Sequence, residues 1–113
     1  MEKFFRINKP AYHNNNTIRV SAEYNKNKGG YCITAELIER MSEPLGCFGK
    51  SFCAEYYKHD GDGIQLVIPC GRRSAKKQAE ADNILERDAE KYAVCFLNHV
   101  NEKLGTDVVI VKE

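Results

Sequence analysis

The sequence predicts an α+β domain in which an antiparallel meander of about four strands packs on one long C-terminal helix, in two layers. Three observations predict it. Apolar and polar residues alternate with period two from Thr17 onward, Gly-Gly and Asp-Gly steps punctuate these runs, and an apolar stripe of helical period occupies the last third of the chain. The chain of 113 residues has the length of one domain, so we expect residues 1–113 to fold as a single unit.

A pair of strands joined by a hairpin is expected in the first half of the chain. In residues 17–24, apolar residues fall on one face and polar residues on the other, which is typical of a half-buried strand. The segment NKNKGG at 25–30 is rich in turn-forming residues, and the alternation resumes over 31–37. The residues ELIERM at 36–41 fit the start of a helix equally well, so the end of the second strand stays open.

Further strands are expected on either side of this pair. The segment KFFRI at 3–7 predicts a short strand that ends before Pro10, since proline fits badly inside a central strand. Residues 52–57 alternate again, and the turn HDGDG at 59–63 contains two Asp-Gly steps. The segment IQLVIPC at 64–70 then predicts the returning strand of the meander.

The long helix is expected over 74–104. Ser74 is suited to the N-cap position because its hydroxyl can accept a hydrogen bond from a first-turn N–H, and Gly105 is suited to ending the helix. DVVIVK at 107–112 is apolar on both faces and predicts a final short strand inside the sheet or covered by another element. The apolar stripe of the helix consists of Ala81, Leu85, Ala89, Tyr92, Phe96, Val100 and Leu104.

Part of this helix is apolar on all sides, in the segment YAVCFL at 92–97. Two explanations fit. Either a loop covers the outer side of the helix there, or that side contacts a second chain or a bound partner. The second explanation makes Val94 and Leu97 candidate interface residues and includes a homodimer among the expected states.

Composition limits the classes of function. The net charge of +1 excludes a global basic field, so any nucleic-acid contact must come from a local patch. The five cysteines form no C-x-x-C pair, the N-terminal residues show no apolar signal region, and no apolar run approaches the length of a membrane span. We therefore expect a cytoplasmic protein with free thiols, no bound metal and no membrane contact. No phosphate-binding loop or nucleophile motif is present, so we expect no enzyme and no cofactor.

The most informative stretch is the start of the helix. Arg72, Arg73, Lys76 and Lys77 crowd this end, and no acidic residue follows until Glu80. A helix N-terminus carries partial positive charge, so exposed cations there cost roughly 0.3–1 kcal/mol each. Either an anionic partner docks on this end, or the residues form an ordinary solvated turn. Further cations would join the contact if the hairpins reach the same face: Lys50, Lys58, Lys26 and Lys28.

Residues 48–85 also resemble the second half of a double-stranded-RNA-binding domain, in which a hairpin is followed by G-x-S-K-K-x-A at a helix start. The residues that follow that order are Gly71, Arg72, Ser74, Lys76, Lys77 and Ala79, with one extra residue before Ser74 and one between Ser74 and Lys76. The resemblance implies that the two lysines contact phosphates across a groove of a duplex. The sequence departs from the family in carrying Glu80 where a further lysine is usual, and the family's preceding helix is not visible.

Two functions from different classes are therefore expected. The first is a small non-enzymatic binding module that contacts the backbone of RNA or DNA through the basic helix start. The second is a protein-binding adaptor or inhibitor, of the size common in mobile elements and phages, that acts on a nucleic-acid-handling protein. The near-neutral net charge favours the second, because dedicated nucleic-acid modules are usually more basic.

Overall fold

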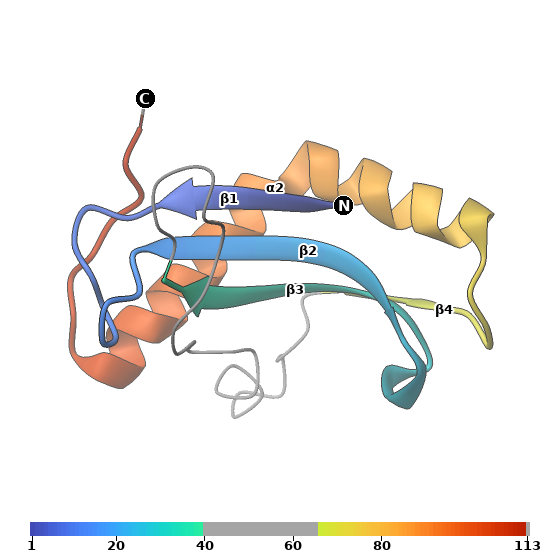
Figure 1. The fold of residues 1–113 in the computed structure, drawn as a ribbon, viewed down its shortest axis with the longest axis horizontal. Coiled ribbons are helices and arrows are strands. Elements are labelled where there is room, and N and C mark those ends of the chain that lie inside the picture. Colours follow the sequence, from blue (N-terminus) through green and yellow to red (C-terminus); the bar gives the residue numbers. More distant parts are fainter. Residues whose placement is uncertain (40–65, 113) are drawn as a thin grey trace.

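The computed structural model describes residues 1–39 and 66–112 of the chain. In these residues four strands form one antiparallel sheet, and one helix packs against it (Figure 1). The α+β prediction is thereby confirmed. The elements in chain order are β1 (Glu2–Arg6), β2 (Thr17–Asn25), the short 3-10 helix η1 (Lys26–Lys28), β3 (Gly30–Ile38), β4 (Leu66–Pro69) and α2 (Ala75–Leu104).

The sheet is a meander, because its spatial order β1-β2-β3-β4 is also the order of the strands along the chain. The central pair β2 and β3 is in register from Thr17 opposite Ile38 to Asn25 opposite Gly30. β4 continues the sheet only beside the first part of β3, where Pro69 lies opposite Gly30. The ends of the β2–β3 hairpin and of β4 consequently lie together.

The core lies between one face of the sheet and α2. The period-two alternation of the sequence places one set of β2 and β3 side chains against the helix, and the helical stripe supplies the other wall. The largest fully buried side chain is that of Phe96. The buried residues from the strands are Ile18, Val20, Ala22, Tyr31, Ile33, Ala35 and Leu37, and those from the helix are Ala81, Leu85, Ala89, Ala93, Phe96, Leu97 and Val100.

Most predicted elements are found close to their expected bounds. The segment 3–7 forms β1, 64–70 contributes β4, and the helix predicted over 74–104 is α2. Residues 36–38 belong to β3, so the alternative helix start at 36–41 is wrong for that part. The strand predicted at 52–57 and the turn at 59–63 lie outside the described residues.

The final segment corrects the sequence analysis. Residues 107–112 were expected to form a strand that is covered on both faces, but they make a single antiparallel bridge, between Ile110 and Ile7. Val108 is buried, whereas Val109 is 57% and Val111 is 39% exposed. The segment is apolar on both faces but is buried on only one of them, because it lies at the margin of the domain and one side of it faces the core.

Candidate functional site

The turn that leads into the predicted basic helix start lies at one end of the molecule, beside the β2–β3 connection (Figure 1). The two segments are joined by a backbone hydrogen bond of 2.9 Å from the N–H of Cys70 to the carbonyl of Gly29. Gly30 allows this close approach, because a Cβ atom at that position would lie 2.1 Å from the carbonyl oxygen of Ile68. The basic end, as we call it, comprises Lys26, Lys28, Arg72, Arg73, Lys76 and Lys77.

The turn between β4 and α2 is fixed by three side-chain contacts. The Cys70 thiol donates to the carbonyl of Arg72 at 2.8 Å, and the backbone N–H of Ser74 donates to the phenolic oxygen of Tyr31 at 2.8 Å. Ser74 is the N-cap, as predicted, and its hydroxyl oxygen accepts from the N–H of Lys77. The turn that carries the two arginines is therefore tied to the core through Tyr31.

Arg73 rests on an aromatic pair. Its guanidinium carbon lies over the ring of Tyr24, 5.3 Å from the centroid. The ring of Tyr24 in turn packs at 5.3 Å and 60° against the ring of Tyr31. A cation over an aromatic face is attracted by the ring quadrupole, so the Arg73 side chain is held in place although the residue is exposed.

The cations of the basic end differ in their exposure. Lys26, Lys28, Arg72, Arg73 and Lys76 are exposed. Lys77 is already in an ion pair with Glu80, at 3.2 Å, so its charge is partly neutralised. The exposed cations therefore supply most of the field.

Two backbone donors add to this field. Among the described residues, the N–H groups of Ala75 and Lys76 have no acceptor, as is usual for a first helical turn. The first turn contains no acidic side chain. Acidic residues begin one turn later and continue along α2, at Glu80, Asp82, Glu86, Asp88 and Glu90. A group of cations without acidic neighbours is thus confined to the first turn and the segment before it, because Arg87, Lys91 and Lys103 further along the helix each directly follow an acidic residue.

The structure places the predicted site residues unevenly. Arg72, Arg73, Lys76 and Lys77 occur together at the helix start as expected, and the β2–β3 connection brings Lys26 and Lys28 to the same end. Lys50 and Lys58 lie outside the described residues, as does most of the hairpin that contributes to the resemblance to double-stranded-RNA-binding domains. Those two lysines and the resemblance stay predictions.

Sequence reasoning missed the role of Tyr24 and Tyr31. Both were assigned to strands, and both were placed where a hairpin connection begins or ends. In the structure they are directly opposite each other in the β2–β3 register. A hairpin with its connection at 25–30 already implies that the two tyrosine rings are cross-strand neighbours. The sequence does not indicate that Arg73 lies over the ring of Tyr24.

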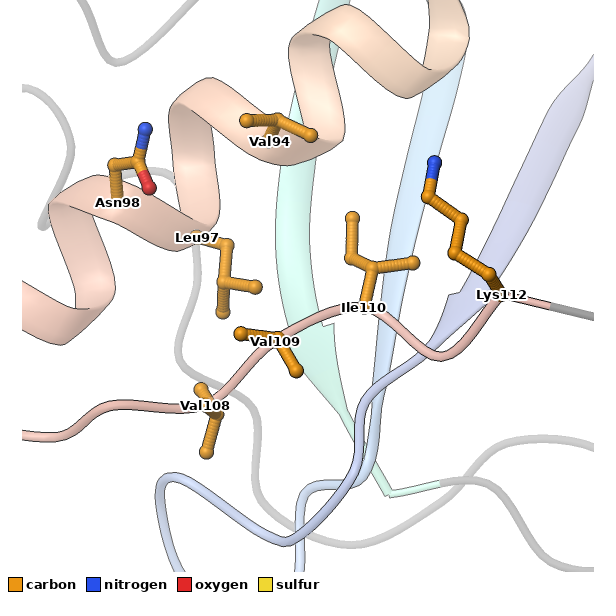
Figure 2. A pocket seen from close by; sticks show the side chains of 7 residues that line it. All are labelled: Val94, Leu97, Asn98, Val108, Val109, Ile110 and Lys112. Carbon is orange, nitrogen blue, oxygen red and sulfur yellow. The ribbon is translucent and has the colours of Figure 1, made fainter.

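The second candidate site lies near the other end of α2, and it separates the two predicted interface residues. Val94 is 42% exposed, whereas Leu97 is 5% exposed and belongs to the core, so Val94 is the exposed one of the two candidates. A cavity of about 240 Å³ lies between the helix and the C-terminal segment. Figure 2 shows the side chains that line it. Its lining residues are Val94, Leu97, Asn98, Val108, Val109, Ile110 and Lys112.

The described thiols are separate from one another. Cys32, Cys70 and Cys95 are free. Burial raises the pKa of the Cys32 thiol, and the nearby Lys28 ammonium partly opposes that increase. Within residues 1–39 and 66–112, no three side chains of the metal-ligating types gather into a cluster. No helix in the same residues combines the length and the apolar character that crossing a bilayer requires.

Comparisons with known proteins give no relative from which a function could be transferred. The chain matches no protein-family model, and neither the curated proteins nor the solved structures contain a significant match. The site must therefore be interpreted from its own geometry.

Proposed function

We propose that the protein is a small non-enzymatic module that binds the backbone of a nucleic acid through its basic end. The observation that carries the proposal is that two cation-bearing segments far apart in the sequence, the β2–β3 connection and the turn before α2, lie side by side and share a backbone hydrogen bond. A solvated turn would account for cations in one segment. It would not account for a second cation-bearing segment beside the first, or for the hydrogen bond by which the core residue Tyr31 holds the turn.

Phosphate is the anion that this arrangement suits best. Arginine and lysine side chains neutralise phosphate charges, and unpaired N–H groups at a helix start donate hydrogen bonds to phosphate oxygens. The exposed cations leave the chain from different elements, so they suit a row of phosphates better than one small anion. Acidic residues along the rest of α2 limit the contact to this end.

Salt dependence tests the proposal directly. Five exposed cations that neutralise five phosphates of a single strand give a slope of log K against log salt of about −3 to −4. Fluorescence anisotropy with labelled single-stranded and duplex oligonucleotides, at several salt concentrations, measures that slope. Absence of binding to every nucleic acid at low salt would contradict the proposal.

A second candidate function is supported by the cavity beside α2. Its exposed apolar residues Val94 and Val109 suit contact with a protein surface, as expected for an adaptor or inhibitor of a nucleic-acid-handling protein. Purification of the tagged protein with and without nuclease separates the two candidates. A protein partner that persists after nuclease treatment, and that is lost in a Val94→Glu variant, would favour the adaptor.

A further inference from the structure

The contact between Arg73 and Tyr24 is an unusual use of a cation in a phosphate-binding surface. An arginine that serves only phosphates gains most from a side chain free to reach them. Arg73 instead lies over an aromatic ring, with its guanidinium carbon 5.3 Å from the ring centroid. Since the residue is nevertheless exposed, part of the guanidinium group stays accessible to a ligand.

The pair beneath Arg73 is held from the core side. Tyr24 packs against Tyr31, which is only 3% exposed and accepts the hydrogen bond from the N–H of Ser74. The same hydrogen bond holds the turn that contains Arg73. Ring and guanidinium are therefore positioned together before any ligand arrives, which lowers the entropy lost on binding.

A nucleic-acid base is the group that such a surface suits. Unpaired bases stack on arginine guanidinium planes and on aromatic side chains, whereas the bases of a duplex are already stacked and paired. The basic end is also small, because acidic residues on α2 begin at Glu80. That size fits a few nucleotides of single strand better than the two successive minor grooves that a duplex-RNA module spans.

We propose that the Arg73–Tyr24 pair is a stacking platform for an unpaired base, so that the basic end prefers single-stranded nucleic acid to duplex. This inference rests on the proposed function. The phosphates of the strand lie along the exposed cations, and one base of the strand covers the guanidinium group of Arg73. Arg73 is then a specificity-determining residue, and its neighbour Arg72 contributes charge alone.

Three ligands and two matched variants test the platform. The ligands are a ten-nucleotide oligothymidylate, an abasic strand with the same number of phosphates, and a duplex of equal length. Arg73→Lys keeps the positive charge but removes the planar group, and Arg72→Lys makes the same exchange at the adjacent exposed residue. The wild-type protein should bind the oligothymidylate about tenfold more tightly than the abasic strand. Arg73→Lys should abolish that difference, and Arg72→Lys should retain it.

The possible failures are distinct. Equal affinity of the wild type for the base-containing and abasic strands, a preference for duplex, or an unchanged preference in Arg73→Lys would overturn the platform while leaving the proposed function intact. Absence of binding to all three ligands at low salt would overturn the proposed function and the platform with it. Unchanged melting temperatures of both lysine variants establish that the comparison is made on folded protein.

Discussion

The backbone N–H of Ser74 donates a 2.8 Å hydrogen bond to the phenolic oxygen of Tyr31, a residue 43 positions earlier in the sequence. This bond joins the N-cap of the helix to the beginning of the inner strand β3. It also explains why a turn that carries two adjacent arginines has a defined position, since charge repulsion alone would spread them into solvent. The basic end is thus anchored to the core by a residue that carries no charge.

Removal of that anchor should cost stability. Tyr31→Phe keeps the buried ring but leaves the N–H of Ser74 without its acceptor, which we expect to lower the free energy of unfolding by about 1 kcal/mol. Urea denaturation measures the change. Tyr24→Phe is the matched control, because no hydrogen bond of its hydroxyl is found among the described residues, and it should change stability little. Equal effects of the two variants would contradict the anchoring role.

The close approach of β4 to β3 predicts a large effect at Gly30. In Gly30→Ala the new Cβ atom would meet backbone atoms, with the Ile68 carbonyl oxygen 2.1 Å away, so the two strands must separate. Such overpacking costs about 1–3 kcal/mol. Gly71→Ala serves as the control, because a Cβ atom there meets nothing within 4 Å. A Gly30→Ala variant that melts at the wild-type temperature would show that β4 does not pack as described.

The alternation of the sequence was sufficient to predict the fold class, because the same residues that alternate in β2 and β3 are the ones that meet α2. The pattern did not predict which residues are buried at the margins of the domain. Val109 and Val111 are as apolar as Val108, and only the position of the segment beside β1 decides which of them is buried.

The sequence predicted the charged residues of the candidate site but not its aromatic residues. Charge order along the sequence identified Arg72, Arg73 and Lys76, since a helix start with no acids is visible in one dimension. The addition of Tyr24 depends on how the turn at 70–74 folds back over the hairpin. That arrangement follows from the Tyr31 hydrogen bond and the approach at Gly30, which only the tertiary structure reveals.

The buried thiol of Cys32 predicts a pH effect. Because burial raises its pKa in the folded state, the stability linked to this group is fully present below the ordinary thiol pKa and is lost as pH rises through the folded value. The melting temperature of the wild type should therefore fall more between about pH 7 and about pH 10 than that of Cys32→Ala. Parallel pH profiles of the two proteins would contradict a raised pKa at Cys32.

The exposed apolar surface at the cavity beside α2 predicts a dimer that forms as the protein concentration rises. If Val94 contacts a second copy, sedimentation of the wild type should show a dimer that Val94→Glu weakens, because the variant places a charge in an apolar contact. Asn83→Glu adds the same charge at an exposed residue of the same helix and should leave the dimer unchanged. A wild-type protein that stays monomeric at high concentration would exclude self-association through this surface.

The most direct test of the basic end is a pair of triple variants with equal net charge. In the first, Arg72, Arg73 and Lys76 are changed to glutamate, and in the second the exposed residues Arg6, Lys91 and Lys103 are changed instead. Acidic residues at a helix start interact favourably with its dipole, so the first variant should melt at or slightly above the wild-type temperature. The measurement is the affinity of both variants for a single-stranded oligonucleotide at low salt. We expect the first variant to lose binding by at least a hundredfold and the second by less than tenfold. Equal losses in the two variants, or full binding by the first, would contradict the account.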